Sequence, residues 1–239
     1  MKFYYDLHIH TSLSPCGDRD MTPNNIVNMA LLKGLDIIAI TDHNSVKNCM
    51  PCIEIAESKG LLVIPGMEIQ TKEEVHLLCL FKDVYKAVEF EKSINTLIPD
   101  IKNKPEFFGE QLIFDIHDNI IGREERLLIS SVDITIQQTF KKVKELDGLV
   151  IPAHIDKKNF SIISNLGFIP FDLDIKTLEI SVHCNKNDLI KEYKYLKRYS
   201  FITNSDAHYL GDISERINYM QIENKTIDEV FKFLNRDIF

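Results

Sequence analysis

Short apolar runs alternate with longer amphipathic stretches along most of this chain of 239 residues. Runs rich in Ile, Val and Leu predict strands at 2–7, 36–41, 61–64, 75–81, 148–153, 176–181, 201–204 and 218–222. The amphipathic stretches predict helices at 22–33, 46–59, 84–97, 135–146, 187–198 and 227–234, with a short helix near Ser161. Pro23 in a first turn, and Gly34 and Gly60 after last turns, mark helix boundaries. The alternation predicts an α/β fold of repeating strand–helix units.

One segment, residues 82–133, interrupts this alternation. It holds the predicted helix at 84–97, a break rich in Lys, Pro and Gly at 103–109, and a hairpin-like stretch at 112–121. The segment is longer and more polar than one strand–helix connection requires, and such segments are usually functional. We interpret it as an insertion in a single domain that spans 1–239, and we expect it to overhang the site and select the leaving group.

Composition narrows the class of protein. Hydrophobic residues make up 44% of the chain and charged residues 27%, which is typical of a globular protein, and no apolar run reaches the roughly 18 residues of a membrane span. The first residues lack the apolar region of a signal peptide. Five cysteines without an export signal indicate reduced thiols, so we expect a cytoplasmic protein with no membrane partner.

The net charge of −8 argues against broad electrostatic binding to nucleic acid, which we do not expect as a partner. A small anionic substrate is compatible with this charge, because bound divalent cations would reverse the local field.

Histidine and carboxylate side chains follow one predicted strand after another. The period of an extended chain puts Asp6, His8 and His10 on one face, where two imidazoles can bind a metal and a carboxylate can orient one of them. Further side chains of ligand type stand at or near later strands: His43, Glu68, His76, His154, Asp206 and His208. A lone His is usually structural, but that interpretation does not explain this recurrence. Barrel enzymes build their sites at strand ends, so we predict a joint metal site there.

His117 and His183 do not share this placement, and we interpret both as surface residues.

The motifs that carry this pattern are DLHIHT at 6–11, TDH at 41–43, GME at 66–68, PAH at 152–154 and NSDAH at 204–208. In this order they resemble the PHP (polymerase and histidinol phosphatase) superfamily, and they span nearly the whole chain. The resemblance implies a distorted seven-stranded (β/α) barrel. It also implies a centre of two or three divalent ions, zinc, manganese or iron, that hydrolyses phosphoesters.

The resemblance also implies a set of ligands. Carried over by motif, one metal would be held by His8, His10, Glu68 and Asp206. Glu68 would bridge to a second metal that His76 and His154 complete, and a third would be held by His43 and His208. Many family members add a His or Asp to the third site. Here Cys16 stands where some relatives have His, so Cys16 or Asp18 is the candidate, or the third site is weak. A Cys16 thiolate would favour zinc.

The implied reaction is attack on a small phosphomonoester by a hydroxide bridged between metals. Asp206 would orient the water or accept its proton, and His43 or His208 would protonate the leaving group. Arg19, Lys157 and Arg123 are candidates for binding the phosphate.

Three alternatives stay open: an amidohydrolase-type reaction, an exonuclease that acts on DNA ends, and a metal-binding barrel without catalysis. The sequence identifies neither the substrate nor the oligomeric state.

Overall fold

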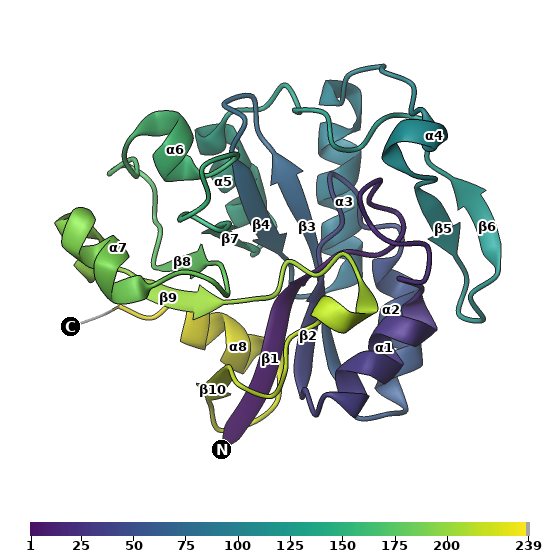
Figure 1. Ribbon diagram of the computed structural model, residues 1–239, viewed down its shortest axis with the longest axis horizontal. Coiled ribbons are helices and arrows are strands. Elements are labelled where there is room, and N and C mark those ends of the chain that lie inside the picture. Colours follow the sequence, from purple (N-terminus) through teal and green to yellow (C-terminus); the bar gives the residue numbers. More distant parts are fainter. Residues whose placement is uncertain (238–239) are drawn as a thin grey trace.

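A computed structural model describes residues 1–237 of the chain. Its centre is a curled six-stranded sheet in the order β10-β1-β2-β3-β4-β7 (Figure 1). These strands are β1 (Lys2–Ile9), β2 (Ile37–Ile40), β3 (Leu62–Gln70), β4 (His76–Leu80), β7 (Leu149–Pro152) and β10 (Tyr219–Gln221). Two further pairs form separate small sheets: β5 (Leu112–Phe114) with β6 (Ile120–Arg123), and β8 (Thr177–Ile180) with β9 (Ser200–Thr203).

Strand direction decides which residues meet at the edge of the sheet. β1, β2 and β3 are parallel, whereas β4 turns back antiparallel to β3 and pairs His76 with Gln70. β7 is antiparallel to β4 and therefore runs in the direction of β3. As a result, the carboxyl ends of β1, β2, β3 and β7 and the first residue of β4 lie at the same edge. His76 joins the other histidines there because β4 is reversed.

Eight helices flank the sheet in the described part of the chain. They are α1 (Pro23–Leu32), α2 (Cys49–Glu57), α3 (Val84–Ile94), α4 (Pro105–Phe108), α5 (Ile136–Glu145), α6 (Ile162–Leu166), α7 (Lys186–Glu192) and α8 (Ile227–Leu234). Thr22 caps α1, and Thr135 and Gln138 form a capping box on α5. None of the described helices has both the length and the apolar character that crossing a bilayer requires.

The core lies on both faces of the sheet. β2 is buried along its whole length, with Ile38 and Ile40 in the larger apolar cluster and Ile37 and Ala39 in the smaller one, which also contains residues of α8. A strand covered on both faces reads as an unbroken apolar run, which is why 36–41 was recognisable from the sequence.

The α/β class is therefore confirmed, with corrections of detail. Six strands form the main sheet of the described chain, and β8 and β9 pair only with each other, so the count of seven barrel strands is not confirmed. β3 continues six residues beyond the predicted Ile64, to Gln70. The helix predicted at 187–198 is two pieces, α7 and a 3₁₀ turn at Lys194–Arg198.

The segment 82–133 divides into two unlike parts. Ala87, Phe90 and Ile94 of α3 are buried in the larger core cluster, so α3 belongs to the helical layer on the sheet. α4, β5 and β6 lie farther out, beside α3 in Figure 1. The N–H of Leu112 in β5 donates to the carbonyl of Ser12 in the loop after β1. This outer part therefore touches the segment that follows β1.

The two ends of 82–133 leave the barrel at different edges. At one end, Val132 N–H donates to the Gln70 carbonyl at the histidine edge. At the other, Lys82 follows the reversed strand β4 and pairs with Asp228 of α8 at 2.7 Å. The first end of the segment therefore does not lie beside the site, because β4 runs away from that edge.

We expect Phe90→Ala to lower the free energy of unfolding by about 3–5 kcal/mol, because deleting a buried ring leaves a cavity. Phe90 is fully buried and packs against Phe81 with ring centroids 5.4 Å apart. Tyr85→Ala on the same helix, at a side chain 76% exposed, is the matched control and should change stability by less than about 0.5 kcal/mol. Chemical denaturation measures both. Equal small effects would mean that α3 is a detachable part of an insertion.

Candidate metal centre

The centre of the site is the Glu68 carboxylate on β3, which is 1% exposed. Five imidazole nitrogens lie within 3.5 Å of it, those of His8 (3.4 Å), His10 (3.5 Å), His43 (3.1 Å), His76 (2.9 Å) and His154 (3.2 Å). They come from β1, from the residue after it, from the loop after β2, from the start of β4 and from the loop after β7. The edge defined by strand direction thus gathers one carboxylate and five imidazoles in a buried space.

The donor atoms form three overlapping groups, each within 4.8 Å: His8, His10, Glu68 and Asp206; His43, Glu68 and His76; and His10, His43 and His208. The first group is the set that the sequence motifs suggested for one metal. His76 Nδ1 and His154 Nε2 approach the same oxygen of Glu68, at 2.9 and 3.2 Å, as a shared second site requires. The role of each residue as a ligand remains a prediction.

The hydrogen bonds fix the tautomers of two histidines. The Ser14 hydroxyl donates to Asp42 at 2.7 Å, so it accepts from His10 Nδ1–H at 2.9 Å. His8 Nδ1 lies 3.0 Å from the Glu179 carboxylate, which can only accept when ionised. His10 therefore presents the lone pair of Nε2 inward, and His8 Nε2 faces it at 3.1 Å. Without a metal the two nitrogens share the proton held by His8. A divalent cation could replace that proton and bind both nitrogens, so the donors fit a metal.

The electrostatics of the cluster also favour a bound cation. Burial opposes a charge on His8, but Glu179 and Asp206 outweigh it and raise the pKa of His8 well above its usual value. Burial lowers the pKa of His10 well below the usual value. Burial also opposes the charge of Glu68, yet the histidines around it, His76 first, hold its pKa well below the usual value. Fixed anionic charge in this buried space attracts cations.

Three loop residues at this edge have left-handed backbone conformations that L-residues seldom adopt. Asn44, His154 and Asp206 have φ angles of 51°, 28° and 56°. The φ of Asp206 aims Oδ1 at the Nε2 atoms of His8 and His10, 3.3 Å from each. Such conformations persist where the surroundings impose them, and they cluster at functional sites.

Sequence reasoning missed Glu179, which is 2% exposed on β8. Its carboxylate accepts from His8 Nδ1, from the His154 N–H at 2.8 Å and from Asn204 Nδ2 at 2.7 Å. It therefore ties the β8–β9 pair to β1 and to the loop after β7. The only signal in the sequence was a lone acidic residue inside the apolar run 176–181.

Asp42 was also missed, although it lies inside a quoted motif. It is fully buried and accepts from the Thr11 N–H at 2.7 Å and from the Ser14 hydroxyl, so it holds the loop that orients His10.

Asp6 has a different role from the expected one. It does not orient an imidazole, since its carboxylate accepts from the N–H groups of Ser205 (3.0 Å) and Ser214 (2.9 Å). Asp6 thereby anchors the loop that carries Asp206.

Cys16 and Asp18 differ in what they face. Burial disfavours the Cys16 thiolate, but interactions with His208 and His43 outweigh it and lower the thiol pKa to about 6. Asp18 instead accepts from the N–H of Asp20 at 2.9 Å. These interactions favour Cys16, an exposed cysteine, over Asp18 as the residue that would join His43 and His208.

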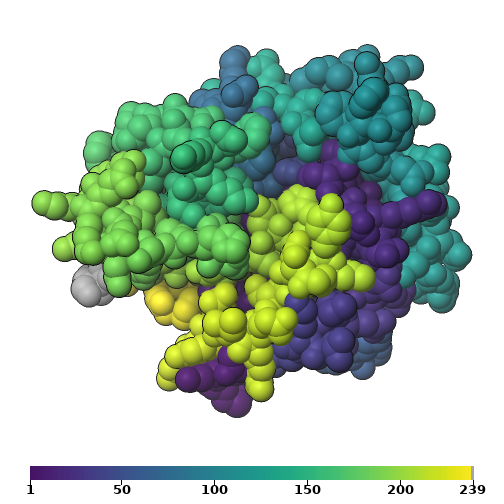
Figure 2. Space-filling model, in the orientation of Figure 1, coloured from purple at the N-terminus to yellow at the C-terminus, as the bar shows by residue number. Residues whose placement is uncertain are grey.

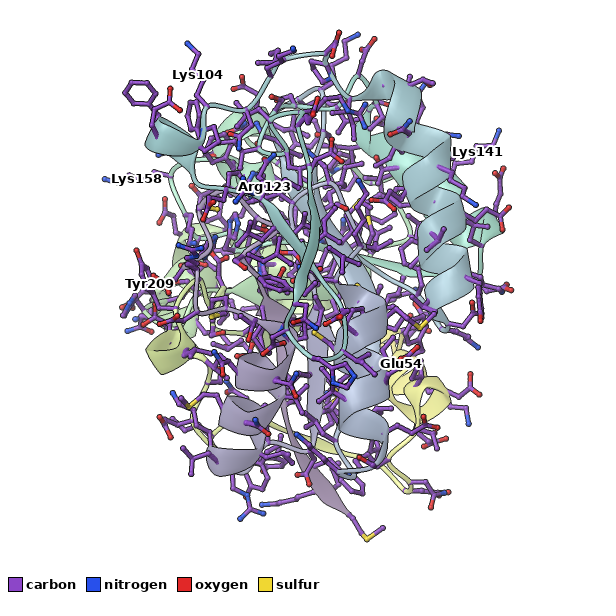
Figure 3. The ribbon with its side chains drawn as sticks, turned by 90° about the vertical axis from the view of Figure 1, so that its right-hand side faces the viewer. Glu54, Lys104, Arg123, Lys141, Lys158 and Tyr209 are labelled. Atoms are coloured by element: carbon purple, nitrogen blue, oxygen red, sulfur yellow. The ribbon has the colours of Figure 1, made fainter. Side chains whose placement is uncertain are left out.

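The three cationic candidates for phosphate binding have different positions. Lys157 Nζ lies 2.5 Å from Asp206 Oδ2 and borders the site. Arg19 and Arg123 both pair with Glu110, at 3.5 and 2.9 Å, and Figure 3 shows Arg123 on the outer hairpin. The structure brings Lys157 to the cluster but not the two arginines. His117 and His183 are exposed, as expected.

A pocket of about 440 Å³ opens onto the cluster, and its walls are His43, Glu68, His76, His154, Lys157, Lys158, Asn159, Phe160, Asp206 and His208. Figure 2 shows the green segment that follows β7 and the yellow-green segment that follows β9 next to each other on one face. None of these lining residues comes from 82–133, so the expected overhang is not part of this pocket as described.

A buried cluster of imidazoles and carboxylates at the strand ends of an α/β sheet is characteristic of a metal centre. The model of the PHP domain family matches residues 6–150, more than half of the chain, and the chain belongs to this family. The resemblance read from the motifs is confirmed.

Among curated relatives, YqxK of Bacillus subtilis, an uncharacterised protein, is 25% identical over 95% of this chain and 60% of its own length. The chain spans about 60% of the length of the first curated relatives that it matches.

Two solved structures share the fold. The lesion-specific endonuclease PfuEndoQ from Pyrococcus furiosus has a TM-score of 0.70 and 22% identity, over 98% of this chain and 56% of its own. A protein from Bifidobacterium adolescentis, assigned by prediction to the metal-dependent phosphoesterases, has a TM-score of 0.60 and 19% identity, over 98% and 96%. At such identities the likeness concerns the fold.

Glu179→Gln should weaken metal binding by about 10–100-fold, because it removes the anion that fixes the tautomer of His8. Glu192→Gln, at an exposed position on α7, makes the same chemical change away from the site and should leave the affinity unchanged. Titration against a chromophoric chelator measures both. If Glu179→Gln bound metal with wild-type affinity, Glu179 would not be part of the metal centre.

Proposed function

We propose that the protein hydrolyses a phosphomonoester that is small or terminal, with two or three divalent ions bound around Glu68. The observation that carries this proposal is the convergence of five imidazoles on one buried carboxylate, beside a pocket of about 440 Å³ with Lys157 in its wall. A pocket of this size suits a small ligand or a chain end. The proposed domain is the whole of 1–239, with an insertion at 82–133 whose helix α3 packs in the core.

The proposed ligands combine the donor groups of the structure with the ligand set that the motifs imply. One ion would be held by His8, His10, Glu68 and Asp206, a second by Glu68, His76 and His154, and a third by His43, His208 and Cys16. Bound divalent ions lower the pKa of water and neutralise charge on phosphate oxygens. Zinc, manganese and iron all suit imidazole and carboxylate donors, and the Cys16 thiol favours zinc at the third position.

The remaining roles fall to residues at the mouth of the cluster. Asp206 Oδ1 already faces His8 and His10, so Oδ2 would orient the attacking water and accept its proton once phosphate draws Lys157 away. Lys157 would then bind a phosphate oxygen. Burial opposes the charge of His43, but Glu68 and then Cys16 raise its pKa to about 10 when no metal is bound. If the third position is not filled by an ion, His43 would therefore carry a proton for the leaving group at neutral pH.

A second candidate is a nuclease, a class that includes the exonuclease on DNA ends named among the alternatives. It is supported by the name of the endonuclease that shares the fold and by the paired cations Lys157 and Lys158 at the pocket. An amidohydrolase-type reaction and a barrel without catalysis have no feature of the described site in their favour.

The test is metal analysis followed by a comparison of p-nitrophenyl phosphate with bis-p-nitrophenyl phosphate. We expect about two or more ions per chain and faster turnover of the monoester, both lost on chelation. Faster turnover of the diester would favour the nuclease, and fewer than one ion per chain after reconstitution would contradict the metalloenzyme.

Glu68→Gln should reduce turnover by more than about 100-fold, because a bridging carboxylate serves two ions. Cys16→Ser changes a residue at the third site alone and should cost about tenfold or less. Initial rates with p-nitrophenyl phosphate measure both, with metal content determined on the same samples. Equal losses in the two variants would contradict the bridge.

A further inference from the structure

The loop between β7 and α6 presents four consecutive side chains to the pocket, Lys157, Lys158, Asn159 and Phe160. All four residues are exposed. Figure 3 shows Lys158 projecting on the same side of the molecule as Tyr209, whereas Lys141 of α5 projects on the opposite side. The loop thus forms one wall of the pocket, and the segment after β9 forms the facing part with Asp206 and His208.

Phe160 is the unusual member of this wall. Its ring stacks on the imidazole of His76, with centroids 4.8 Å apart and planes 12° from parallel. The side chain is nevertheless 41% exposed, so the ring areas that His76 leaves uncovered are open to solvent at the pocket. Because this ring is exposed beside the metal cluster, burial in the hydrophobic core does not explain its position.

The loop holds this ring in a fixed and disfavoured conformation. Phe160 has a φ of 58°, and its carbonyl accepts from the His76 N–H at 2.8 Å. On one side of the loop, Asp156 accepts from both the N–H (2.7 Å) and the hydroxyl (2.6 Å) of Ser181. On the other side, Ser161 caps α6 by accepting from the Ser164 N–H at 3.1 Å. Strain that is held in this way is characteristic of functional positions.

The side chains of this wall suit two different chemical groups of a ligand. The ammonium groups of Lys157 and Lys158 suit a phosphate, and the flat ring of Phe160 suits a planar aromatic group. Bases stack on aromatic side chains whatever their identity, because every base has a π-face. The described pocket of about 440 Å³ has room for one nucleotide.

We propose that Phe160 is a stacking platform that selects phosphate esters of a nucleobase, free nucleotides or nucleotides at a strand end. This specificity rests on the proposed phosphoesterase function. The phosphate is bound at the metal cluster and the base packs against the ring. Phe160 acts on recognition of the base and leaves the chemistry at phosphorus to the cluster.

The kinetic test compares adenosine 5′-monophosphate with ribose 5-phosphate, which lacks the base. The metal-loaded wild type should prefer the nucleotide, and Phe160→Ala should raise its KM by about tenfold while leaving ribose 5-phosphate within about twofold. Phe171→Ala, at a ring 75% exposed outside this pocket, is the matched control and should change neither substrate. A 5′-phosphorylated oligonucleotide as a third substrate distinguishes a strand end from a free nucleotide.

Equal losses for both substrates in Phe160→Ala would overturn the proposal, because the ring would then only shield His76. A wild type that hydrolyses both substrates equally well would overturn it too, while leaving the phosphoesterase function intact.

A binding test does not depend on turnover. The chain contains no tryptophan, so Phe160→Trp introduces one fluorophore at the pocket. In the metal-loaded variant, stopped-flow mixing with adenosine 5′-monophosphate should quench this emission, ribose 5-phosphate should not, and Phe171→Trp should respond to neither. No quenching by the nucleotide, or equal quenching by both ligands, would refute the stacking. Quenching without hydrolysis would support base stacking at residue 160 and contradict the proposed phosphoesterase function. Failure of the stacking proposal and failure of the proposed function are therefore distinguishable.

Discussion

The structure depends on one buried carboxylate that five imidazoles approach. Glu68 is 1% exposed, and nitrogens of five histidines lie within 3.5 Å of its carboxylate oxygens. A buried charge is costly unless it is paired, so the segments that supply these imidazoles must stay in register with β3. The loop after β2 does so through main-chain bonds, with the Glu68 N–H donating to Asp42 and the Asn44 N–H to Glu68. The need to compensate this charge thus ties the strand ends of the sheet to one another.

Around this centre, a second set of polar groups fixes the orientation of the imidazoles. Glu179 sets the tautomer of His8, and Asp42 does the same for His10 through the Ser14 hydroxyl. Because both carboxylates also accept backbone N–H groups, they join the folding of the loops to the chemistry of the site. The orienting groups are as specific to the site as the donors themselves, which is common in metal enzymes.

The loop 157–160, which forms one wall of the pocket, is held in place differently from the buried metal cluster. Its residues belong to one short loop with a left-handed residue near each end, His154 and Phe160. The loop is anchored by Asp156 and by the backbone of β4, and its side chains are exposed at the pocket. A rigid cluster with a replaceable loop beside it allows one chemistry to serve different substrates. The insertion, by contrast, contacts the segment after β1, on the side of Cys16.

The sequence by itself determined the class of fold and which side chains are candidate donors of the site. Apolar periodicity located almost every strand and helix, because burial imposes its period on the chain. The motifs located the histidines, Glu68 and Asp206, because the chemistry requires those residue types in that order. Only the tertiary structure decided that β4 is reversed, that Glu179 completes the site from β8, and that Arg19 and Arg123 face Glu110 instead. These facts depend on pairing between residues far apart in the chain, and no local pattern of residues records such pairing.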